Sequence, residues 1–122
     1  MILKEVGYFN ELKHGRKNGP SLKDSISKSP LDNEEKIVFY LTNGIDFISS
    51  PGVVRDIFDE TRIIGGLSIY TDGTWMWPSD LIYYVENYHV SLPDEFLNYM
   101  KSKNWSPPQE NEIDFSKLEV LK

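Results

Sequence analysis

Residues 70–85 read YTDGTWMWPSDLIYYV and carry the clearest local signals of the chain. Asp72-Gly73 lies between β-favouring runs and predicts a hairpin with a type I′ turn, which needs positive φ at both central residues. Pro78 has no N–H for a sheet ladder, so we expect the second strand to end there. Ser79 is a favourable N-cap for the helix that follows. The stretch therefore predicts strand, turn, strand and helix in immediate succession.

The side chains of this stretch also predict which faces are buried. Trp75 and Trp77 alternate along the second strand and share one face, while Met76 points to the other. We expect the two tryptophans to fill a core, because such rings bury large areas. The helix over residues 79–89 has one apolar stripe at helical spacing, formed by Leu81, Tyr84, Val85 and Tyr88. Tyr83 lies opposite that stripe and is expected to be an exposed aromatic anchor for a partner.

Working outward, turn residues and apolar spacing predict short elements on both sides. Val53 to Glu60 shows apolar residues at helical spacing and is predicted as a short helix, after a strand over residues 45–48 that ends at Ser49-Ser50-Pro51-Gly52. Before these elements we predict a first strand over residues 1–9, an exposed loop over residues 10–20 and a helix over residues 21–28 capped by Ser21. A further helix is predicted from Asp32, with a capping box to Glu35, and is expected to end at Asn43-Gly44. The last predicted helix begins at Ser91-Leu92-Pro93-Asp94.

This order of elements predicts an α+β fold, with a small, mostly antiparallel sheet, a central β-hairpin and helices packed on it. We expect residues 1–108 to form one compact domain. Residues 109–122 form a polar tail, either docked on the body or partly flexible. Its apolar residues are Ile113, Phe115, Leu118, Val120 and Leu121.

The composition fits a reducing compartment, and we expect a cytoplasmic protein. The chain has 122 residues, a net charge of −6 and no cysteine, which excludes disulfides, cysteine metal sites and thiol catalysis. No apolar run approaches the roughly 20 residues that span a bilayer, so we expect no membrane segment.

The charge is unevenly distributed. Residues 1–31 carry +3, residues 32–95 carry −9, and residues 96–122 are balanced. The acidic middle argues against nucleic-acid binding, which requires basic surface. It suits a basic protein partner, although solubility alone would also explain it.

The sequence predicts no catalytic residue, metal site or cofactor. The two histidines, His14 and His89, lack a second ligand at metal spacing, and neither HExxH nor GxSxG occurs. Gly65-Gly66 lacks the Lys-Ser/Thr of a phosphate loop and precedes a strand, so we interpret the pair as a bulge or close backbone approach.

Several blocks of the chain resemble small bacterial immunity proteins of contact-dependent growth inhibition and related polymorphic toxin systems. The similarity covers most of residues 6–108, and its most specific part is the Asp-Gly-x-Trp-x-Trp-Pro block. The matching blocks are GYFxELxHG (7–15), GPSLxD (19–24), VRD (54–56), IGG (64–66), TDGxWxWPxDLxYYV (71–85) and YHVxLPxEF (88–96). The tail beyond Pro108 lies outside the pattern.

The resemblance implies a non-enzymatic, monomeric cytoplasmic protein that neutralises a cognate toxin domain, a basic nuclease in many such systems, by covering its active site. Acidic side chains would occupy the substrate-phosphate site, and an aromatic would anchor the contact. The partner-binding residues predicted on this basis are Asp56, Asp59, Glu60, Asp72, Tyr83 and Glu86.

Two alternatives remain open from the sequence. The first is a small enzyme or ligand-binding domain with an aromatic pocket around His89, Tyr83 and Asp80. The second is a structural subunit that oligomerises through an exposed tail segment.

Overall fold

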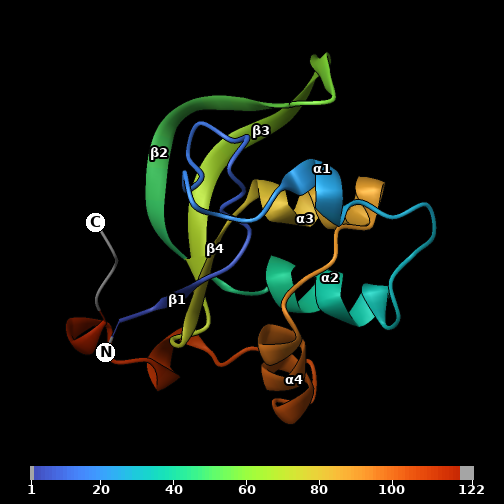
Figure 1. Ribbon diagram of the computed structural model, residues 1–122. Helices are drawn as coiled ribbons and strands as arrows, with labels where there is room; N and C mark the ends of the chain where they lie inside the picture. The colour runs from blue at the N-terminus through green and yellow to red at the C-terminus, as the bar shows by residue number, and fades with distance from the viewer. Residues whose placement is uncertain (1, 119–122) are drawn as a thin grey trace.

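In the computed structural model, which describes residues 2–118, a four-stranded sheet carries the α-helices on one side (Figure 1). The strand order is β1-β4-β3-β2, with β1 parallel to β4 and the other pairs antiparallel. The α+β prediction is confirmed. In chain order the elements are β1 (Lys4–Glu5), α1 (Leu22–Ser25), α2 (Glu34–Thr42), β2 (Ile45–Asp56), β3 (Asp59–Thr71), β4 (Trp75–Pro78), α3 (Asp80–Tyr88), α4 (Asp94–Ser102) and the 3₁₀ turns η1 (Glu110–Glu112) and η2 (Phe115–Lys117).

The main core lies between the sheet and α2, α3 and α4. Trp77 is completely buried there, and its indole N–H donates to the carbonyl of Leu41 at 3.2 Å. The rings of Trp75 and Phe96 are 4.8 Å apart. The predicted burial of both tryptophans is confirmed, because the alternation of β4 turns them towards the helices.

The opposite face of the sheet holds a smaller apolar cluster. Leu3, Tyr8, Ile69 and Met76 are buried in it, with Phe47 and Leu118 packed against them. Leu118 belongs to the C-terminal tail, so this part of the tail docks on the sheet. Val120 and Leu121, also predicted as docking residues, lie outside the described residues.

The hairpin between β3 and β4 forms where predicted but with a different turn. Gly73 has φ +91°, whereas Asp72 is not among the residues with positive φ, so the turn is not type I′. The Asp72 carboxylate shapes it instead, accepting hydrogen bonds from the N–H groups of Thr74 at 2.8 Å and Trp75 at 2.6 Å.

Ser79 precedes α3 as predicted but does not cap it. Its hydroxyl accepts a hydrogen bond from the N–H of Ser68 in β3 at 3.0 Å. A neighbouring strand therefore competes successfully for the hydroxyl that would otherwise satisfy the helix terminus.

The largest correction concerns residues 49–60. The predicted helix from Val53 to Glu60 is absent, and β2 continues through Pro51-Gly52 to Asp56 before the chain turns into β3. Register shifts surround Pro51-Gly52, and Gly52 has φ +90°. A bulge thus absorbs the residues that we expected to end the strand.

Other element boundaries differ less. Ser21 caps α1 as predicted, accepting from Asp24 N–H at 3.2 Å. The predicted side-chain caps from Asp32 and Ser91 are not used, because α2 follows Asn33 and α4 follows Pro93, neither with a side-chain cap. Among residues 2–118, no helix combines the length and apolar character needed to cross a membrane.

Candidate functional site

A single carboxylate fastens the end of the β2–β3 hairpin to α3. Asp56, the last residue of β2, is completely buried. Its Oδ2 accepts hydrogen bonds from the hydroxyls of Tyr83 at 2.7 Å and Tyr88 at 2.5 Å, and its Oδ1 accepts from the Phe58 N–H at 2.8 Å. Both tyrosines belong to α3, so this carboxylate clasp sets how the hairpin lies over the helix.

The electrostatics of the clasp favour a fixed protonation state. Burial alone would raise the pKa of Asp56, but the hydrogen bonds from Tyr88, Tyr83 and the Phe58 N–H outweigh burial and hold this pKa below its usual range. The bond to Asp56 is also the main cause that raises the pKa of Tyr88 to about 12. At neutral pH the carboxylate is ionised and the phenol is neutral, which suits a structural clasp.

Aromatic rings extend the contact between hairpin and helix. The Phe58 ring at the hairpin turn lies 4.9 Å from the ring of Tyr88. The Arg62 guanidinium lies 5.4 Å from the ring centre of Tyr83. Tyr83 is half-buried, and its hydroxyl is committed to Asp56. It is therefore less exposed than the sequence predicts.

The β2–β3 hairpin carries several exposed apolar side chains. Beyond the three residues of β3 that pair with β4, the ribbon has only two strands, and its tip is the uppermost part of the view in Figure 1. Four of the seven exposed large apolar residues among residues 2–118 lie on this hairpin: Ile48, Val53, Phe58 and Ile63. Val53 and Ile63 are 61% and 58% exposed. The sequence does not predict this exposure: Val53 and Phe58 fall in the segment that we expected to be a helix, and Ile48 and Ile63 lie on either side of it.

The predicted acidic contacts divide into exposed and buried residues. Asp59 and Glu60 are exposed at the start of β3, and Glu86 is exposed on α3. Asp56 and Asp72 are buried, so neither can touch a partner directly in this arrangement. The structure thus groups Asp59 and Glu60 with the exposed apolar residues of the hairpin.

The buried Asp72 lies at the turn of the second hairpin, between β3 and β4. Besides its two backbone donors, it accepts a hydrogen bond from the buried hydroxyl of Tyr40 at 2.6 Å. Burial raises the pKa of Asp72 even though these hydrogen bonds oppose the shift. The carboxylate thus holds the turn and the start of β4 together.

The three residues of the alternative small-enzyme hypothesis are not brought together. His89 Nδ1 lies 2.7 Å from Glu34 Oε1, which joins the end of α3 to the start of α2. Asp80 begins α3, nine residues before His89 and therefore roughly 13.5 Å away along the helix at 1.5 Å per residue. Tyr83 is bound to Asp56.

Asp80 instead meets the other histidine. His14 Nε2 lies 2.9 Å from Asp80 Oδ2, and the Asp80 side chain is 1% exposed. The contact is an ion pair when His14 is protonated, and the Asp80 oxygens have no other partner among residues 2–118. Both residues line a pocket of about 350 Å³ between residues 11–14 and the end of the hairpin. Nothing in the sequence links these residues, which are separated by most of the chain.

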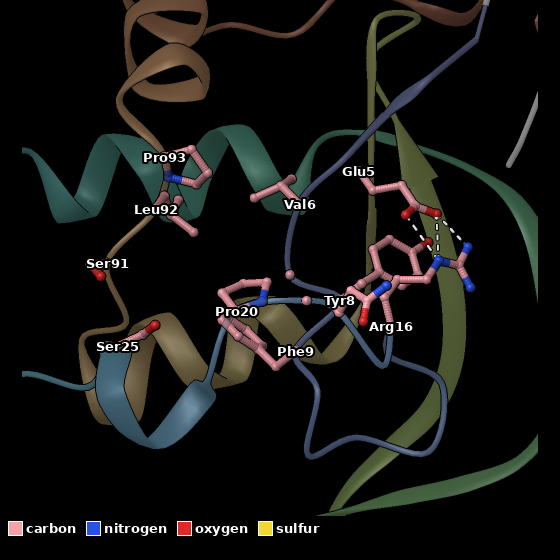
Figure 2. A pocket seen from close by; sticks show the side chains of 13 residues that line it. Glu5, Val6, Tyr8, Phe9, Arg16, Pro20, Ser25, Ser91, Leu92 and Pro93 are labelled. Carbon is pink, nitrogen blue, oxygen red and sulfur yellow. Dashed lines mark hydrogen bonds and ion pairs between the residues drawn. The ribbon is translucent and has the colours of Figure 1, made fainter.

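A second pocket, of about 480 Å³, lies on the other side of the loop formed by residues 10–20. Figure 2 shows Phe9, Pro20 and Leu92 gathered in it, with the ion pair of Glu5 and Arg16 at one side. This pocket is mainly apolar, and its lining residues Glu5 and Arg16 pair with each other.

No group of three or more metal-ligating side chains gathers anywhere within residues 2–118. Comparisons with protein-family models, curated proteins and solved structures give no match to the chain. The candidate site therefore stands on geometry alone: the exposed apolar side chains of the hairpin, the Asp56 clasp and the adjacent pocket.

Proposed function

We propose that this protein is a cytoplasmic immunity protein that binds a toxin domain, a basic nuclease, and covers its active site with the β2–β3 hairpin. The observation that most supports this proposal is the concentration of exposed apolar side chains on that hairpin, led by Val53 and Ile63. Exposed apolar residues grouped on one element are typical of protein-binding surfaces.

The acidic net charge of the chain supports the same assignment, although the exposed Arg55 and Arg62 balance Asp59 and Glu60 on the hairpin itself. Asp59 and Glu60 lie beside the apolar residues and are exposed. The chain carries a net charge of −6, so a basic nuclease domain would be attracted at long range. Within the contact, carboxylates can take the place of substrate phosphates, while apolar side chains at the centre exclude water.

The construction of the hairpin supports a pre-organised contact. The Asp56 clasp and the packing of Phe58 on Tyr88 fix the ribbon against α3 before any partner arrives. A rigid contact surface loses less conformational freedom on binding, which favours affinity.

The direct test is to co-express the chain with the protein encoded immediately upstream, purify the complex and measure its affinity. We expect a stable one-to-one complex that suppresses the partner's nuclease activity and protects cells. The double variant Val53→Ser/Ile63→Ser should weaken binding by at least about tenfold while leaving the melting temperature nearly unchanged, because both side chains are exposed.

A matched control uses Ile2→Ser/Ile26→Ser, since both residues are exposed isoleucines outside the hairpin. This variant should bind like the wild type. Absence of a complex, or equal loss in both double variants, would contradict the proposed function or its assignment to the hairpin.

A further inference from the structure

We propose that the distal part of the β2–β3 hairpin, residues 53–63, is a hinged lid over the pocket that holds the His14–Asp80 pair. The lid turns about a line of glycines that crosses the ribbon, and the Asp56 clasp is the latch that keeps it closed. This inference concerns the free protein and does not depend on the proposed function.

The hinge consists of glycines at the same level of both strands. Gly52 precedes Val53, whose partner across the ribbon is Gly66, and Gly65 pairs with Val54. The ladder shifts register on both sides of these two pairs. A Cβ on any of the three glycines would meet nothing within 4 Å, so no packed side chain locks the bend. Gly52 and Gly65 have φ +90° and +137°, and glycine changes between such backbone angles at little cost.

Beyond the glycine line, little buried surface holds the ribbon in place. Of residues 53–63, Asp56 is buried, Val54 and Ile57 are half-buried, and the others are exposed. Segments with so little buried surface open at a much lower free energy than the core of a domain. We therefore expect residues 53–63 to open as a unit while the sheet and helices stay folded.

The contacts that close the lid come from three tyrosines of α3. The hydroxyls of Tyr83 and Tyr88 both donate to Oδ2 of Asp56, and the hydroxyl of Tyr84 accepts from the N–H of Ile57 at 3.2 Å. These contacts hold the closed state that the structure shows. Without the two donors, the Asp56 carboxylate would lose hydrogen bonds only in the closed state, because water replaces them when the lid opens.

The lid covers the pocket of about 350 Å³ beside residues 11–14. Residues 53–57 and Glu60 of the hairpin line this pocket together with Leu12, His14 and Asp80. In Figure 1 the ribbon bends over above α3 and the loop of residues 10–20. Opening of the lid therefore admits solvent and solutes to the side chains beneath it.

Native-state hydrogen exchange of the wild type tests the position of the hinge. We expect the ladder amides of residues 53–63 to exchange at similar rates to one another and at least about a hundredfold faster than those of β4. The ladder amides of residues 45–50, on the other side of the glycine line, should exchange more slowly than those of residues 53–63. Core-like protection of residues 53–63, or exchange of both segments together, would overturn the hinge.

A single engineered thiol tests the latch, because the chain has no cysteine of its own. Leu12→Cys places the thiol beneath the lid. Leu92→Cys is the matched control, since both leucines belong to the main core and are 7% exposed, but Leu92 lines the other pocket. Tyr83→Phe/Tyr88→Phe, introduced into both cysteine variants, removes the two donors of the latch.

Removing these donors should raise the rate of thiol labelling in Leu12→Cys by about tenfold or more and leave the rate in Leu92→Cys nearly unchanged. Equal acceleration in both variants would mean that the whole fold loosens, which would overturn the latch. An unchanged rate in Leu12→Cys would overturn it as well. Should a cysteine variant not fold, the exchange measurement on the wild type still decides whether residues 53–63 move as a lid.

Discussion

The hydroxyl of Tyr88 donates a 2.5 Å hydrogen bond to Oδ2 of Asp56, which joins the last residue of α3 to the last residue of β2. The two residues are 32 positions apart in the chain. Through this bond, α3, which follows the Trp-x-Trp-Pro segment, holds the position of the hairpin to which we assign partner binding. The sequence predicts that Asp56 contacts the partner directly. In the structure Asp56 is buried and instead holds in place the hairpin that carries the proposed contact residues.

Tyr88→Phe should therefore loosen the hairpin. Losing a hydrogen bond to a buried carboxylate is expected to lower the free energy of unfolding by about 1–2 kcal/mol and to speed hydrogen exchange at the amides of residues 53–63. Urea unfolding and exchange measurements would check both effects. Tyr70→Phe is the control, because no hydrogen bond of the Tyr70 hydroxyl is found within residues 2–118, and it should change stability by about 0.5 kcal/mol or less.

The clasp should also make stability depend on acid pH. Because the folded state lowers the pKa of Asp56 from its ordinary 3.8, the ionised carboxylate stabilises the fold above that value, and this contribution disappears as pH falls through the lower, folded-state pKa. Urea unfolding between neutral pH and acid should show a steeper loss in the wild type than in Asp56→Asn. Asp72, whose pKa is shifted the opposite way, is present in both proteins and cancels from the difference. Parallel pH profiles would contradict the assignment.

Gly44→Ala should destabilise the core. A Cβ at Gly44 would lie 2.4 Å from Cζ2 of the buried Trp77, so the indole or the α2–β2 connection must shift. Overpacking of this kind costs about 1–3 kcal/mol, which thermal unfolding and tryptophan fluorescence would detect. Gly66→Ala is the matched control, because a Cβ there meets nothing within 4 Å. Equal stability of the two variants would show that the close approach to Trp77 is unimportant.

Charge reversal at the hairpin should act on the association rate. Asp59→Lys/Glu60→Lys should slow binding to the toxin domain by about tenfold at low salt, and the difference from wild type should shrink at high salt as screening increases. Stopped-flow measurements over a salt series would test this.

Asp32→Lys/Glu35→Lys makes the same change in net charge on exposed residues near the start of α2. This control should slow association less than the hairpin variant. An equal effect of both variants would mean that only the total charge matters, and that Asp59 and Glu60 do not lie at the contact.

The sequence by itself determined the local elements whose signals are short-range. The alternation of Trp75 and Trp77, the stop at Pro78 and the apolar stripe of α3 all predict what the structure shows, because each depends on backbone geometry within a few residues. The same information gives the α+β class. Of the acids predicted to bind a partner, Asp59, Glu60 and Glu86 are exposed, and their role in binding stays a prediction.

Only the tertiary structure decided the conformation of residues 53–60 and the environment of each carboxylate. Val53, Val54, Ile57 and Phe58 fit a helical period, but pairing with β3 and packing of Phe58 on α3 stabilise a strand and turn instead. Asp56 meets Tyr88, and His14 meets Asp80, across separations that no local pattern encodes. Whether an acidic side chain is exposed, like Asp59, or buried against a partner, like Asp56 and Asp80, depends on which distant groups the fold brings next to it. Tertiary packing determines those neighbours, and the local sequence does not encode them.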